Sequence, residues 1–114
     1  MPTKIDREFD LNQAGYRAAL QLQGANAATV QLSLLSDSTP SACIVTIKRS
    51  LDGENWTGLQ SAQTFAHGSF SASILSLMTD KIDCAGFDWL AAEVTTAEGA
   101  ALIGRLTIFA NRTF

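Results

Sequence analysis

The strongest constraint on the fold is an alternation of apolar and polar residues with a period of two. In "TVQLSLL", Val30, Leu32 and Leu34 fall on one face, and Gln31 and Ser33 fall on the other. This period places successive side chains on opposite sides of a strand, whereas a helix repeats every 3.6 residues. The windows "ACIVTIKRS" and "ALIGRLTIFA" repeat the pattern. We therefore predict strands that bury one face, with a core that includes Leu32, Val45, Ile47, Val94, Leu106 and Ile108.

Turn-forming residues separate these windows at the spacing of a sandwich or barrel. They occur in "QGANA", "SDSTPS", "LDGEN", "AHG", "CAG" and "TAEG". The expected fold is all-β, an antiparallel β-sandwich or jelly roll of about eight strands. Gly104, inside an apolar window, indicates a bulge or a close backbone approach. The segment 70–78 stays open between a strand and a short helix, because its apolar residues fit a helical spacing.

The size and charge of the chain exclude several classes of protein. A chain of 114 residues forms one domain. Its 8 Lys and Arg against 11 Asp and Glu leave no cationic surplus for binding nucleic acid. No apolar run predicts a signal peptide or a membrane span. We therefore expect a protein of the cytoplasm, in which Cys43 and Cys84 are reduced core thiols rather than a disulfide.

The N-terminal segment is expected to be peripheral, so that residues 1–12 form an arm or edge strand and residues 13–114 form the sandwich. The segment mixes charged residues with apolar ones at alternating positions. Two interpretations remain open: an edge strand of the domain's own sheet, or an arm that docks on a neighbouring subunit. The candidate docking residues of the second interpretation are Ile5, Arg7, Phe9 and Leu11.

A second candidate site is the stretch "SLDGENW" at residues 50–56. The segments before and after it are strand-like, and Asp52-Gly53 supplies the positive φ of a tight hairpin turn. Trp56 then begins the returning strand, where it either caps the core or stacks on a ligand. In the second case Asp52, Asn55 and Trp56 form a surface site.

Residues for catalysis, metal or cofactor binding are not grouped in the sequence. The single histidine, His67, lies beside a glycine in an expected turn, and neither cysteine lies in a nucleophile motif. Ligands for zinc are not clustered, and "DGEN" lacks the alternating oxygen ligands of a calcium loop. We therefore expect a protein that is not an enzyme and has no metal and no cofactor.

The order of two segments, "VTIKRSLDGENWTGL" and then "IDCAGFDWLAAEVTTAEGAALIGRLTIFAN", resembles small β-sandwich virion proteins of tailed bacteriophages. In those proteins an "S-x-D-G-x-x-W" hairpin follows a long strand, and the resemblance covers residues 16–110. It implies a decoration or cement protein that binds and stabilises the assembled head. It further implies a homo-oligomer, a trimer in our expectation, with a capsid shell protein as partner. The protein would be made in the host cytoplasm and end in the virion, and its position on head, neck or tail stays open.

Composition favours assembly for a separate reason. A 46% apolar content and many small residues on the strand faces allow close packing against copies of the same chain. The alternative function is a carbohydrate- or receptor-binding module, in which an aromatic platform and polar groups at Asp52, Asn55 and Trp56 bind hydroxyl groups.

Overall fold

The computed structural model describes residues 3–35, 39–58, 64–71 and 73–112. These residues form ten strands and one turn of 3-10 helix. The elements are β1 (Thr3–Asp10), β2 (Arg17–Gln21), β3 (Ala27–Leu34), β4 (Ile44–Ser50), β5 (Trp56–Gly58), β6 (Thr64–Ala66), η1 (His67–Ser69), β7 (Ser76–Met78), β8 (Ile82–Asp83), β9 (Trp89–Thr96) and β10 (Ile103–Asn111).

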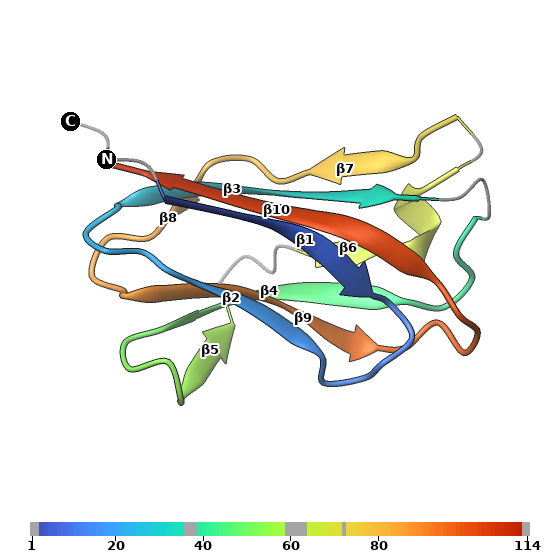
Figure 1. The fold of residues 1–114 in the computed structure, drawn as a ribbon, viewed down its shortest axis with the longest axis horizontal. Helices are drawn as coiled ribbons and strands as arrows, with labels where there is room; N and C mark the ends of the chain where they lie inside the picture. Colours follow the sequence, from blue (N-terminus) through green and yellow to red (C-terminus); the bar gives the residue numbers. More distant parts are fainter. Residues whose placement is uncertain (1–2, 36–38, 59–63, 72, 113–114) are drawn as a thin grey trace.

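The strands form two antiparallel sheets that face each other (Figure 1). The first sheet has the order β1-β10-β3-β7, with β8 also paired to β3, and the second has the order β2-β9-β4-β5, with β6 also paired to β4. This arrangement confirms the predicted all-β sandwich. The described part holds ten strands instead of about eight. One side of β3 pairs with two short strands, β7 and β8, and one side of β4 pairs with two others, β5 and β6.

The segment 70–78 contains strand and no helix in its described residues. Ser71 and Ile74 form an isolated bridge, and Ser76–Met78 is β7. Leu77 lies opposite Leu32 of β3, so pairing with the sheet outweighs the helical spacing of the apolar residues. No helix among the described residues is long and apolar enough to cross a membrane.

The core lies between the two sheets and contains the inward residues of the alternating windows. All six predicted core residues are fully buried. Gly104 of β10 marks a close approach of backbones, because a Cβ there would lie 2.9 Å from the carbonyl oxygen of Ser33. Cys43 and Cys84 are buried free thiols, as predicted. Burial is the largest cause that raises the pKa of each thiol to about 11.

The N-terminal segment is an edge strand of the first sheet, because β1 pairs along its whole length with β10. Phe9 and Leu11 are fully buried in the domain's own core. Ile5 packs against that core, and Arg7 donates a hydrogen bond of 2.9 Å to the hydroxyl of Tyr16. This corrects the expectation that Phe9 and Leu11 dock on a neighbour: the alternating apolar residues of β1 fill the inner face of its own sheet.

Candidate functional site

The turn between β4 and β5 is a hairpin, as the sequence predicts. Ser50 pairs with Trp56 across its base, and Gly53 has φ +81°. Glycine is required here for a second reason, since a Cβ at Gly53 would lie 3.0 Å from the indole ring of Trp89. The turn is therefore fixed both by its backbone conformation and by its contact with β9.

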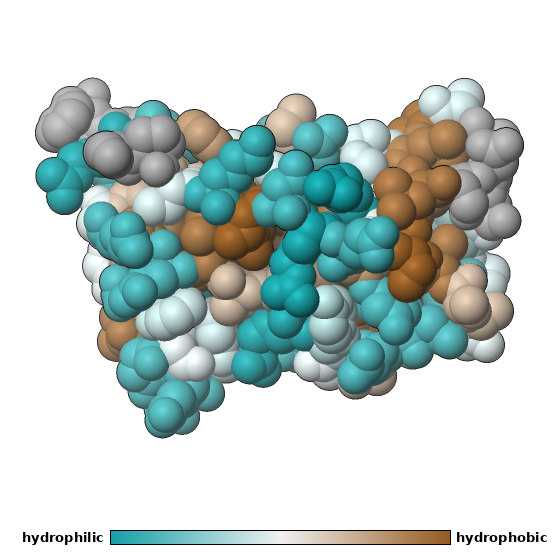
Figure 2. Space-filling model, in the orientation of Figure 1, coloured by the Kyte–Doolittle hydropathy of each residue, from teal (hydrophilic) through white to brown (hydrophobic). Residues whose placement is uncertain are grey.

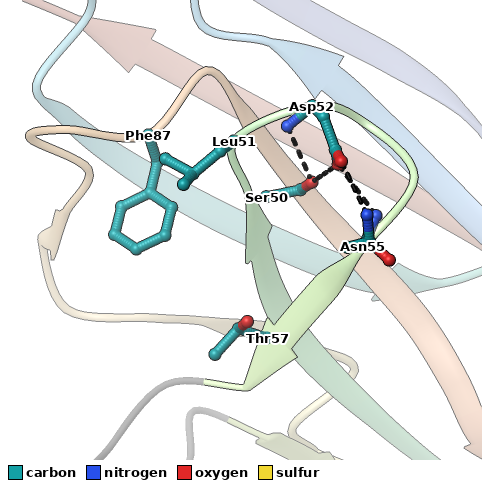
Figure 3. Close-up of a pocket in the computed structure, with 6 residues that line it drawn as sticks. All are labelled: Ser50, Leu51, Asp52, Asn55, Thr57 and Phe87. Atoms are coloured by element: carbon teal, nitrogen blue, oxygen red, sulfur yellow. Dashed lines mark hydrogen bonds between the residues drawn. The ribbon is translucent and has the colours of Figure 1, made fainter.

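The Asp52 carboxylate holds this turn together (Figure 3). Its Oδ1 accepts hydrogen bonds from the backbone N–H groups of Glu54 and Asn55, both at 2.8 Å, and from the hydroxyl of Ser50 at 2.9 Å. Its Oδ2 accepts the side-chain amide of Asn55 at 2.7 Å. The backbone N–H groups of Asn55 and Glu54 are the main causes that hold the pKa of Asp52 far below its usual range. The carboxylate is thus occupied by donors of its own turn.

A hollow of about 290 Å³ opens beside the turn. The hairpin supplies one wall of it, and Phe87 from the loop before β9 supplies the other (Figure 3). Arg49 lies beneath this second wall, with its guanidinium 4.2 Å from the centre of the Phe87 ring. The lining residues are Ser50, Leu51, Asp52, Asn55, Thr57 and Phe87. They bring one carboxylate and two hydroxyl groups to the hollow, and the Ser50 hydroxyl donates its hydrogen bond to the Asp52 carboxylate.

Trp56 lies away from this hollow and contacts a different set of residues. The guanidinium of Arg17 on β2 lies 4.8 Å from the centre of the indole ring. Asp52 and Asn55 line the hollow, whereas Trp56 does not. The structure therefore divides the predicted surface site into two parts, because successive side chains of β5 and its turn point to different sides of the sheet.

The Arg17 guanidinium belongs to a charged cluster that the sequence did not reveal. Its Nη2 lies 2.6 Å from the Glu93 carboxylate on β9, and Lys48 on β4 lies 2.8 Å from the same carboxylate. Glu93 is only 9% exposed. Burial raises its pKa, but the hydrogen bonds and charges of Lys48 and Arg17 outweigh burial, and the pKa is lowered. The cluster ties three strands of the second sheet together.

A second carboxylate that the sequence did not single out is Glu98, in the loop between β9 and β10. It accepts hydrogen bonds from the backbone N–H groups of Ser41, Ala42 and Cys43 at 2.7–3.0 Å, and from the Ser41 hydroxyl at 3.0 Å. Its own N–H donates to the carbonyl of Leu11. Glu98 thus connects three loops at one end of the sandwich. Only its acidity and its position beside a glycine could have drawn attention to it.

Metal-binding groups do not gather in the part of the chain that the structure describes. No three or more of its His, Cys, Asp and Glu residues are placed to share an ion. The carboxylates of Asp52, Glu93 and Glu98 each have protein donors or cations around their oxygens.

No protein-family model and no curated protein matches the sequence. Similar folds occur in solved structures. One is from the acid-stable capsid of Helicobacter pylori bacteriophage KHP30, with a TM-score of 0.55, 18% identity, and coverage of 96% of this chain and 92% of that chain. A second is the SPBc2 prophage-derived protein YomS, with a TM-score of 0.53, 11% identity and 96% coverage of both chains.

A third similar structure comes from Bacillus endospore appendages, described as disulfide-linked pili, with a TM-score of 0.51, 18% identity, and coverage of 99% of this chain and 88% of that chain. At these identities the similarity establishes a shared β-sandwich fold. Phage and capsid proteins are among the proteins with this fold.

Proposed function

We propose that the protein is a non-enzymatic structural component of a tailed-phage virion, a capsid decoration or cement protein that binds and stabilises the assembled head. The observation that carries this proposal is the fold shared with the KHP30 capsid structure, which extends over nearly the whole of both chains. The resemblance of residues 16–110 to phage virion proteins supports the same function.

The described residues also support a structural function. Among the described residues, the hollow beside the β4–β5 turn is lined by no histidine, cysteine or lysine, and its one carboxylate, Asp52, accepts hydrogen bonds from its own turn. The Glu93 and Glu98 carboxylates cross-link strands and loops of distant parts of the chain. A stiff sandwich of this kind loses little conformational freedom when it binds, which favours assembly. The homo-oligomer expected from the sequence, a trimer in that expectation, would present several copies of each contact to a shell.

The alternative function, a carbohydrate- or receptor-binding module, has less support. A sugar platform needs a free aromatic face beside polar groups that can bind hydroxyls. In this structure the Arg17 guanidinium lies over Trp56, and the Asp52 carboxylate already accepts four hydrogen bonds from its own turn. The two halves of the predicted sugar site therefore do not form one platform.

Assembly through disulfides, the mode described for the endospore appendages, is also disfavoured. Such links need a thiol that a neighbouring chain can reach. Both cysteines of this chain are buried, and burial raises the pKa of each. We therefore propose that any assembly of this protein is non-covalent.

Co-sedimentation with phage shells tests the proposal. The probes are assembled shells of the phage that encodes this chain and, as a matched control, the same shell protein before assembly. We expect the protein to sediment with the shells and to bind the unassembled subunits far more weakly, because only the lattice presents several contacts at fixed spacing. Binding to neither probe, together with retention on a glycan column, would replace the cement function by the carbohydrate-binding one.

A further inference from the structure

The two sheets each end in an open strand on the same side of the sandwich. β1 has β10 as its only partner among the described strands, and β2 has β9. Both open strands lie along the side that faces the viewer in Figure 1. Figure 2 shows mainly hydrophilic surface on this side, interrupted by apolar surface near its centre and at one end. An open strand presents unpaired backbone N–H and C=O groups, to which another chain can add.

On β1 these free backbone groups belong to charged residues. Leu11 donates its N–H to the carbonyl of Leu102, which continues the β1–β10 register. In an antiparallel pair, every second residue directs its N–H and C=O toward the partner strand. The odd-numbered residues of β1 therefore face β10, and the free groups belong to Lys4, Asp6, Glu8 and Asp10. Charged residues at a sheet edge disfavour pairing with another chain.

On β2 the free backbone groups lie among different side chains. Leu22 donates its N–H to Asp88, and Val94 donates its N–H to Tyr16, both in the β2–β9 register. The even-numbered residues therefore face β9, and the free N–H and C=O groups belong to Arg17, Ala19 and Gln21.

The side chains on either side of Ala19 are drawn away from the free edge. Arg17 binds Glu93, and Gln21 donates to Asp88 at 3.1 Å. Glu93 lies on β9 and Asp88 directly before it, so both acceptors are on the side of β2 that pairs with β9 and not on the free side. The centre of the edge is the methyl group of Ala19, whereas on β1 each residue with free backbone groups has a charged side chain.

We propose that β2 pairs with β2 of a second copy, antiparallel and around a two-fold axis at Ala19. This register places Ala19 opposite Ala19 of the second copy, and Arg17 opposite Gln21 of the second copy. All three free residues of each strand are then bonded, in about six hydrogen bonds. A register with the two-fold axis at Arg17 would place the two Arg17 guanidinium groups opposite each other. It would also leave the rest of β2 without a partner.

The two second sheets then form one continuous sheet across the dimer. A two-fold dimer replaces the trimer as the expected unit of self-association. This inference identifies the partner surface within the self-association that the proposed function includes. It does not require that the dimer bind a shell.

Light scattering on the purified full chain tests the pairing. We expect a molar mass twice the 12.2 kDa of one chain. Ala19→Pro should give a monomer, because proline removes the N–H at the centre of the free edge. The matched control is Glu8→Pro, which removes a free N–H of β1 in the same way. Neither N–H faces a partner strand within the chain, so both variants should keep the sandwich, as checked by circular dichroism, and Glu8→Pro should stay dimeric.

A charge exchange at the same position gives a second test that avoids proline. Ala19→Lys and Ala19→Glu should each be monomeric, because like charges would meet at the two-fold axis. An equal mixture of the two variants should regain the dimer mass, and added salt should weaken that mixed dimer. Restoration in the mixture supports the pairing even if the proline variant fails to fold.

Four outcomes overturn the inference: a monomeric or trimeric wild-type chain, dissociation of Glu8→Pro to the same extent as Ala19→Pro, dimers of both single charge variants, or no recovery in the mixture. The co-sedimentation experiment fails or succeeds separately. A dimer paired through β2 that does not bind shells would support the pairing and refute the cement function. A monomer that binds shells would refute the pairing and support the cement function.

Discussion

Replacing Glu98 by glutamine should destabilise the fold. The carboxylate accepts hydrogen bonds from three consecutive backbone N–H groups and from the Ser41 hydroxyl. Glutamine keeps one acceptor oxygen and loses the charge. A hydrogen bond to a charged group contributes about 1.5–3 kcal/mol, and the bonds that glutamine retains are weaker, so we expect a loss of about 2 kcal/mol after allowing for partial exposure.

Thermal unfolding followed by circular dichroism measures this effect. For a domain of this size, a loss of about 2 kcal/mol corresponds to a fall in Tm of about 6–12 °C. Glu8→Gln is the matched control, since Glu8 is an exposed residue of β1 whose side chain has no hydrogen bond or ion pair with the residues that the structure describes. An unchanged Tm for Glu98→Gln, or an equal fall for both variants, would refute the stabilising function of the Glu98 contacts.

The pH dependence provides an independent check. Burial raises the pKa of Glu98, but hydrogen bonds from the N–H groups of Ala42, Ser41 and Cys43 outweigh it, and the pKa is lowered. A lowered pKa in the folded state means that the stabilisation is present above the ordinary carboxyl pKa and is lost as the pH falls toward the lowered value. The Tm difference between wild type and Glu98→Gln should therefore be largest near pH 7 and should shrink below about pH 4.3, the ordinary glutamate pKa. A constant difference down to pH 3 would contradict this assignment.

Three further predictions concern the turn and the thiols. Gly53→Ala should cost roughly 1 kcal/mol or more, measured by urea unfolding, and more than Gly99→Ala, which shares the positive φ but has open space around it; equal costs would show that crowding by the indole does not matter. Alkylation of Cys43 and Cys84 by iodoacetamide at pH 8 should be slow in the folded chain and reach both thiols in urea, because the raised pKa of each leaves little thiolate; rapid labelling of the native chain would contradict their burial. Calcium should leave the Tm unchanged, since donors of the turn already occupy the Asp52 carboxylate, and a rise of several degrees would reveal a cation site there.

Local features of the structure could be predicted from the sequence because their causes are local. The period of two assigns each residue of a strand to one face, which is why Val45, Leu106 and the other predicted core residues are buried. The hairpin followed from Asp52-Gly53, because a positive φ is a property of one residue and its neighbours. The choice between strand and helix at 70–78 was not local, since pairing with β3 decided it.

Tertiary structure decided which distant residues meet. Periodicity could not tell whether the apolar residues of the first strand fill their own core or a neighbour's, and the pairing of β1 with β10 placed Phe9 and Leu11 inside. Periodicity also could not show that Trp56 contacts Arg17 while Asp52 lines the hollow beside the turn.

The sequence by itself thus determined the strands, their buried faces and the β4–β5 turn. The clusters at Glu93 and Glu98 arose only from the folded chain, because each carboxylate binds groups 45 or more residues away in sequence. The free edge at Ala19 also depends on the fold, since strand order and hydrogen-bond phase decide which backbone groups remain unpaired. Such contacts follow from how strands are ordered and aligned between sheets, and alternation along one strand contains no information about that order.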